Sequence, residues 1–105
     1  MPQWDVYPNP APASRERIPY LVVLQSDLLD GLPTRLVAPL SRSSVGADEL
    51  PRRLAPVVTV AGESLVVKAH EVGVVPARAL GAAVTSLRGD SHRLVDAIDA
   101  VISGI

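Results

Sequence analysis

The chain has 105 residues, no cysteine and a formal net charge of -1, with 10 Lys and Arg against 11 Asp and Glu. The lack of cysteine excludes disulfides, thiol chemistry and cysteine-based zinc sites, and the near-neutral charge gives no general attraction to nucleic acid or to an anionic membrane. Apolar residues make up 48% of the chain, yet the sequence has neither a secretory signal pattern nor an apolar run of about 20 residues. We therefore expect one soluble, cytoplasmic domain over residues 1–105.

The N-terminal part is expected to form two strands separated by a proline-rich loop. Residues 4–7 (WDVY) alternate and predict a short strand. Residues 8–17 carry prolines at every second position at their start, which restrict the backbone and remove N–H donors. They predict an exposed, mobile loop. Residues 18–25 (IPYLVVLQ) are apolar and β-branched and predict a second strand.

A turn-rich segment and a third strand are expected next. Residues 26–33 (SDLLDGLP) contain Ser, Asp, Gly and Pro, which favour turns, and this segment holds Leu28 and Leu29. Residues 34–40 (TRLVAPL) predict a strand. Because proline donates no backbone hydrogen bond, Pro39 should confine this strand to a sheet edge or to a bend.

The clearest hairpin lies at residues 56–70, after an irregular polar segment (43–55) with room for one helical turn around Leu50. Two valine-rich runs flank a turn in which Gly62 can supply the positive φ that such turns need. Residues 74–84 return as a short strand or a helix. Five or so short strands and one terminal helix predict a mainly β (α+β) fold, either a small, partly open barrel or a curled sheet.

The last segment predicts an amphipathic helix that runs almost to the final residue. Asp90 or Ser91 can cap its N-terminus with a side-chain oxygen. An apolar stripe should pack on the sheet, and it consists of Leu94, Val95, Ile98, Val101 and Ile102. Asp96, Asp99 and Ser103 share the opposite face, where carboxylates oppose the helix dipole by a few tenths of a kcal/mol. A solvated face and a partner-binding face explain these residues equally well.

The residues form no catalytic or metal-binding pattern. His70 and His92 lie outside any metal-ligand or triad spacing, and no glycine-rich loop leads from a strand into a helix. The arginines are scattered, with local pairs only at 15 and 17 and at 52–53, and such pairs more often keep a loop soluble than bind phosphate. The residues therefore predict a binding protein that is not an enzyme and uses no cofactor.

A series of short motifs resembles the CcdB toxin family. These motifs are VY at 6–7, QSDLLD at 25–30, LVAPL at 36–40, PVV at 56–58, VP at 75–76, AI at 97–98 and the closing GI. They follow the family pattern without a gap from Gln25 to Ile105, whereas the proline-rich loop is longer than in the best-known member. The resemblance implies an SH3-like, partly open barrel of short antiparallel strands with a C-terminal α-helix. It also implies a homodimeric toxin of a toxin–antitoxin pair.

Toxins of that family trap DNA gyrase on cleaved DNA by binding the dimerisation part of its A subunit. The resemblance implies gyrase-binding residues at Leu28, Leu29, Asp99, Ile102, Ser103, Gly104 and Ile105. The last three residues of both protomers would meet near the dimer axis. The family ends in Trp-Gly-Ile, but this chain ends in Ser-Gly-Ile, and Ser103 can neither stack on a gyrase arginine nor bury a comparable area. Asp99 also replaces an uncharged amide of the best-known member, and Ile102 replaces an aromatic side chain.

The family's antitoxin has a disordered C-terminal segment that folds onto the toxin, in a groove bordered by the loop after the first strand. The implied antitoxin-binding residues are Pro8, Asn9, Pro10, Ala11, Pro12, Ala13, Ser14 and Arg15. Two alternatives to a gyrase inhibitor stay open. One is a non-toxic homologue that binds antitoxin as a decoy or regulator, which the serine at 103 favours. The other is a MazF-like ribonuclease toxin on the same fold, which the scattered arginines disfavour.

Overall fold

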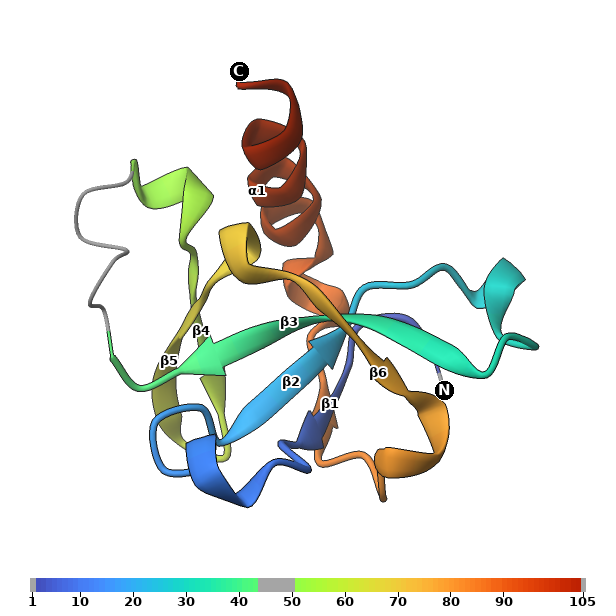
Figure 1. The fold of residues 1–105 in the computed structure, drawn as a ribbon. Helices are drawn as coiled ribbons and strands as arrows, with labels where there is room; N and C mark the ends of the chain where they lie inside the picture. The colour runs from blue at the N-terminus through green and yellow to red at the C-terminus, as the bar shows by residue number, and fades with distance from the viewer. Residues whose placement is uncertain (1, 44–50, 105) are drawn as a thin grey trace.

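A computed structural model describes residues 2–43 and 51–104 of the chain (Figure 1). Within these residues the chain forms short strands, single 3₁₀ turns and one α-helix. The strands are β1 (Asp5–Pro8), β2 (Tyr20–Val23), β3 (Thr34–Ser41), β4 (Val57–Val60), β5 (Glu63–Val67), β6 (Gly73–Pro76) and β7 (Thr85–Ser86). The 3₁₀ turns are η1 (Pro12–Ser14), η2 (Asp27–Leu29), η3 (Arg52–Leu54), η4 (Ala69–Glu71), η5 (Ala77–Ala79) and η6 (Arg88–Asp90), and helix α1 spans Ser91–Ser103.

The strands form one antiparallel sheet in the order β4-β5-β3-β2-β1-β7, with β6 paired to β3 beside β5. The sheet curls into a nearly closed barrel, and α1 stands at one end of it (Figure 1). This arrangement confirms the predicted SH3-like, partly open barrel of antiparallel strands with a C-terminal helix.

Both faces of the sheet carry a core, which explains why the central strands are apolar on both sides. One cluster contains Val6 and Val22 and includes Leu94 of α1. Tyr7 and Leu21, the next residues on the same strands, belong to a second, smaller cluster on the other face. The helix therefore packs on the larger core.

The central strand β3 corrects the prediction for Pro39. This strand pairs with β2 on one side and with β6 and then β5 on the other, so it is not an edge strand. The Pro39 carbonyl accepts a hydrogen bond of 3.0 Å from the Lys68 N–H, so its nitrogen faces the same side as β5 and β6. Pairing with β6 ends at Val37 and pairing with β5 begins at Leu40. The missing proline donor thus falls where β3 changes its partner from β6 to β5.

Most of the proline-rich loop is exposed, as predicted, but Asn9 is buried. Pro8 still belongs to β1, and Asn9 is only 5% exposed. The Asn9 side chain donates to Ser14 Oγ (3.0 Å) and to the Ile18 carbonyl (2.8 Å), and it accepts from the Ala11 N–H (2.9 Å). These bonds fold the loop back on itself because the short amide can satisfy several backbone groups at once.

The predicted hairpin at 56–70 is confirmed as β4 and β5. Its turn has positive φ at both central residues, 51° at Ala61 and 80° at Gly62, which is the pattern of a type I′ turn. The helical turn expected around Leu50 falls outside the described residues, and the turn that follows it in the structure is η3. For residues 74–84, where a short strand or a helix was expected, the structure has a short strand. This strand, β6, ends at Pro76, and the single turn η5 follows it.

Candidate functional site

Helix α1 packs through a face that differs from the predicted stripe. Leu94, Ala97 and Ala100 are its buried residues, with Ile98 partly buried against the core. Val95, Val101 and Ile102, which were predicted to pack on the sheet, are exposed. The small alanines allow the helix axis to lie close to the barrel, so the packed face is rotated toward them and away from the larger side chains.

The start of α1 also differs from the prediction. Asp90 is the N-cap residue, but its side chain makes no capping hydrogen bond. Its carboxylate accepts a hydrogen bond of 2.7 Å from Nη1 of Arg93 instead. Turn η6 runs directly into the helix, and Ser91 is already the first helical residue. The carboxylate of Asp90 therefore orients the side chain of Arg93 and does not cap the helix.

Helix α1 is regular to Ser103 and ends in a defined cap. Gly104 takes a left-handed conformation (φ 76°, ψ 17°), and its N–H donates to the Ala100 carbonyl at 2.9 Å. Ser103 Oγ donates to the Asp99 carbonyl at 2.6 Å. Ile102 is 80% exposed. The helix thus presents Asp99, Ile102 and Ser103 to solvent in a fixed geometry, whereas Ile105 lies outside the described residues.

Turn η2 presents a second group of predicted binding residues. Leu28 is 94% exposed and Leu29 about half exposed at the tip of a loop. The Leu28 N–H donates to Ser26 Oγ (3.2 Å), which caps the turn. In Figure 1 this loop projects from one side of the barrel, and the end of α1 projects in another direction. One chain therefore does not bring Leu28 together with Ser103.

A buried arginine that the sequence analysis did not single out holds this leucine loop. Arg35 lies in β3 with its side chain almost fully buried. Its Nη1 donates to the carbonyls of Leu32 and Thr34, and its Nη2 donates to the Asp30 carbonyl (2.7 Å) and to Asp30 Oδ1 (3.0 Å). Arg35 thereby ties both sides of the loop to the sheet.

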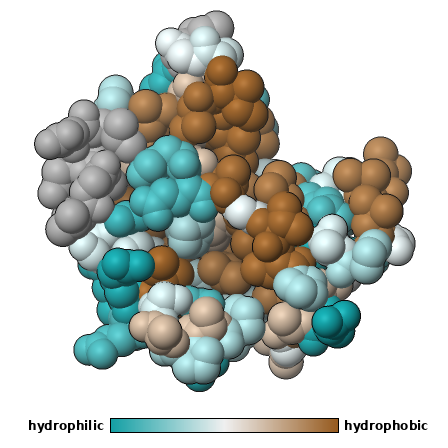
Figure 2. All heavy atoms as spheres, viewed as in Figure 1, coloured by the Kyte–Doolittle hydropathy of each residue, from teal (hydrophilic) through white to brown (hydrophobic). Residues whose placement is uncertain are grey.

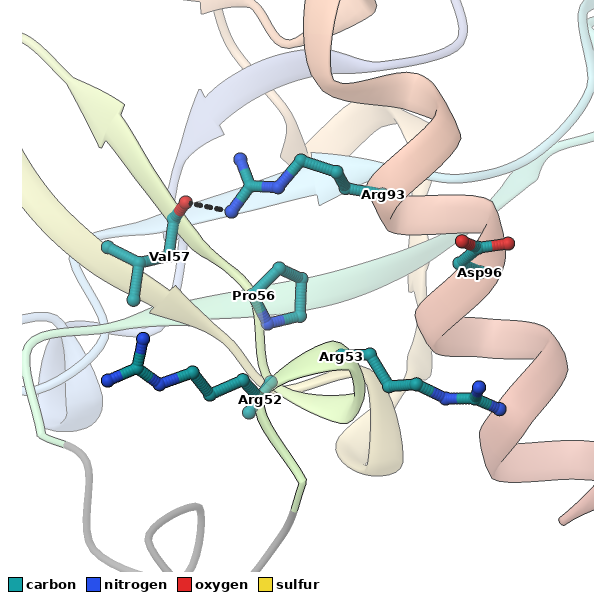
Figure 3. A pocket seen from close by; sticks show the side chains of 7 residues that line it. Arg52, Arg53, Pro56, Val57, Arg93 and Asp96 are labelled. Atoms are coloured by element: carbon teal, nitrogen blue, oxygen red, sulfur yellow. Dashed lines mark hydrogen bonds between the residues drawn. The ribbon is translucent and has the colours of Figure 1, made fainter. Parts of the chain in front are cut away.

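A cleft of about 580 Å³ lies between η3 and α1 (Figure 3). Its lining residues are Arg52, Arg53, Ala55, Pro56, Val57, Arg93 and Asp96. A neighbouring hollow of about 380 Å³ continues along the helix, and it is lined by Arg53, Asp96, Asp99, Ala100, Ile102 and Ser103. The arginine pair at 52–53, interpreted from the sequence as a solubility feature, thus faces the exposed side of α1.

In the view of Figure 2, apolar side chains gather near α1, along the middle of the molecule and on the loop that projects at the right. The described residues contain no group of three or more His, Cys, Asp or Glu side chains that could hold a metal ion. In the same part of the chain, no helix is long and apolar enough to cross a membrane.

Solved structures with the same fold include toxins. The chain matches an endoribonuclease in complex with its cognate antitoxin from a mycobacterial species, with a TM-score of 0.72 and 8% identity over 98% of this chain and 95% of that one. It also matches the Mycobacterium tuberculosis toxin MazF-mt6, with a TM-score of 0.65 and 17% identity over 80% of this chain and 85% of that one. At these identities the likeness establishes a shared fold and nothing further.

The family is established by a separate comparison. The family described as "CcdB protein" matches residues 3–104. The chain therefore belongs to the CcdB family of toxin–antitoxin toxins, as the short motifs predicted, and it carries the fold that this family shares with MazF toxins.

Proposed function

We propose that this protein is the toxin of a toxin–antitoxin module and binds the A subunit of DNA gyrase by protein–protein contact, without catalysing a reaction itself. The observation that carries this proposal is the end of α1, which stays helical to Ser103 and closes with the left-handed Gly104. A binding segment that is already ordered loses less conformational entropy when it meets its partner. In the CcdB family this segment is the gyrase contact.

The exposed leucines of η2 supply the second part of the proposed contact, and a homodimer would combine the parts from two chains. Leu36 and Val74 form a direct cross-strand pair between β3 and β6, and both side chains are exposed. Such a pair on the barrel surface suits burial across a two-fold axis. In that arrangement the helix ends of both protomers would contribute Ser103, Gly104 and Ile105 to one surface.

The serine at 103 should make the gyrase contact weak. Loss of an aromatic side chain at an interface hot spot costs about 2–4 kcal/mol, and the loss enters twice in a homodimer. Asp96 and Asp99 have no ion pair within the described part of the chain and are free to meet basic groups of the target. Exposed pairs of this kind contribute less than about 1 kcal/mol each, so they recover only part of the loss.

Calorimetric titration of the isolated gyrase A dimerisation domain tests this proposal. We expect weak binding of the natural chain, tighter binding by Ser103→Trp, and no binding after removal of Gly104 and Ile105. His92→Trp is the matched control, because residue 92 is exposed at the other end of α1. Tight binding by the natural chain that neither the tryptophan at 103 nor the deletion changes would refute the assignment of the tripeptide.

We further propose that the antitoxin's disordered segment contacts the loop from Pro8 to Arg15, through its exposed residues and not through the buried Asn9. This requires amides in 10–17 to exchange faster than those of the β4–β5 hairpin, and to become protected when antitoxin binds. Equal protection in the free protein would argue against a loop that folds onto its partner.

A ribonuclease is the second candidate, and the specific observation in its favour is the fold shared with a mycobacterial endoribonuclease. Cleavage of single-stranded RNA by the purified protein, abolished together with its toxicity by substitutions in one groove, would favour this candidate. Antitoxin binding without any gyrase binding would instead favour the decoy or regulator.

A further inference from the structure

The cleft between η3 and α1 has a charge pattern that the proposed gyrase contact does not use. Arg52, Arg53 and Arg93 line one cleft, although the chain as a whole carries a net charge of -1. Figure 3 shows Arg52 and Arg93 on either side of Val57, with Arg53 reaching toward α1. None of these arginines belongs to the residues assigned to the gyrase contact.

Arg93 is held in place before any ligand arrives. Its Nη1 donates to Asp90 Oδ1 (2.7 Å), and its Nη2 donates to the Val57 carbonyl (2.6 Å). A guanidinium group has five N–H donors in one plane, so several donors stay available for a ligand. A side chain with a fixed orientation loses less entropy when it binds a carboxylate.

Within the described residues, Arg52 and Arg53, unlike Arg93, are not held in place by an ion pair. Both are exposed, and neither forms an ion pair with any other residue in the described ranges. Neighbouring like charges repel each other, and a bound anion removes this repulsion. Charge-assisted hydrogen bonds from arginine to carboxylate are about twice as strong as neutral ones.

The remaining walls select the kind of anion. Ala55, Pro56 and Val57 form an apolar wall, and Val57 is 51% exposed despite its position in β4. Asp96 stands at the helix side of the cleft. A carboxylate there repels a doubly charged phosphate, and it offers an acceptor for a backbone N–H. Apolar contact, anion contact and a backbone acceptor together match an extended peptide.

We propose that this cleft docks an acidic peptide segment of a partner protein, a stretch in which carboxylate side chains alternate with apolar ones. The carboxylates meet the arginines, and an apolar side chain covers the exposed Val57. The cleft shares Arg53 and Asp96 with the hollow that leads to the helix end, but the proposal does not depend on gyrase being the target.

Fluorescence anisotropy tests the proposal with a labelled peptide of alternating glutamate and leucine and a matched peptide of glutamine and leucine. We expect the glutamate peptide to bind about tenfold more tightly at ~50 mM salt, with the difference shrinking at higher salt. The double variant Arg52→Gln/Arg53→Gln should lose about tenfold in affinity. Arg78→Gln/Arg88→Gln removes the same charge from exposed arginines elsewhere and should change the affinity little. Val57→Ser should weaken binding without changing the charge.

Several results would overturn the proposal. Equal losses in the two double variants would show non-specific attraction, and equal affinity for the two peptides would remove the role of the carboxylates. Absence of binding at millimolar peptide would contradict a docking site. Displacement of the peptide by inorganic phosphate or by an RNA oligomer at lower concentration than unlabelled peptide would assign the arginines to a phosphate ligand. Thermal unfolding of each variant verifies that the fold is intact, and Arg53→Gln alone repeats the test with a smaller change.

Discussion

Gly104→Ala tests whether the end of α1 is preorganised for binding. Gly104 lies at φ 76° and ψ 17°, in the left-handed region, which costs an L-residue with a Cβ about 1–2 kcal/mol. A Cβ built at this position meets no atom within 4 Å. The cost is therefore conformational, without a steric clash.

This cost should be relieved locally and not by unfolding of the domain. The glycine N–H that closes the helix on Ala100 (2.9 Å) is lost when residue 104 leaves the left-handed region. The binding-competent conformation of the helix end then becomes less populated. The affinity for the target falls by the same factor as the fraction of molecules in that conformation. A change of 1–2 kcal/mol corresponds to about 5–30-fold.

Gly104→Asn is the matched control, because asparagine enters the left-handed region more readily than alanine. Both substitutions are best made beside Ser103→Trp, so that binding to the gyrase A dimerisation domain is measurable by titration. We expect a 5–30-fold loss for alanine by the strain above, a smaller loss for asparagine, and nearly unchanged thermal unfolding for both. Equal affinities for the alanine and asparagine variants, or an alanine variant that binds like glycine, would refute the reasoning.

Three further predictions concern the barrel. Arg35→Met removes the charged hydrogen bonds that hold the leucine loop and should lower the free energy of unfolding in urea by about 2–4 kcal/mol; a change near zero would contradict this role. Ala61→Asn should raise stability by several tenths of a kcal/mol, because Asn-Gly suits a turn with positive φ at both positions, and a lower thermal midpoint would contradict it. The hydrogen bond from Arg42 lowers the pKa of Glu63 below its ordinary value of 4.5. The stabilisation is present above that pH and is lost as the pH falls through the lower folded-state pKa. The difference in urea midpoint between the natural chain and Glu63→Gln should therefore shrink below pH 4.5, and a difference that grows there would be inconsistent with the pair.

Local signals predicted the elements whose geometry is decided within a few residues. Gly62 marked the hairpin turn, and the helix at the end of the chain followed from its apolar spacing. The strand β7 has two residues, which are too few to show an alternating pattern. It is defined by its pairing with β1, which the local sequence does not reveal. The central position of Pro39 depends in the same way on β5 and β6, which lie later in the sequence.

The same distinction between local and long-range signals applies to the candidate sites. The exposure of Asp99 and Ser103 could be predicted because the helical spacing puts them on one polar face, whereas the same spacing wrongly placed Ile102, which is 80% exposed, on the sheet. The arginine cleft could not, because Arg93 reaches the Val57 carbonyl across 36 positions of sequence. Arg35 was read as one residue of a strand, and only the folded loop reveals the carbonyls that surround its guanidinium group.

Hydrogen exchange of the natural protein, alone and with saturating gyrase A dimerisation domain, tests the central claim most directly. The proposed contact predicts slower exchange at the amides of 100–104 and of Leu28 and Leu29, with the β4–β5 hairpin unchanged. Protection elsewhere with the helix end unaffected, or no protection anywhere, would contradict a gyrase contact made by the end of α1.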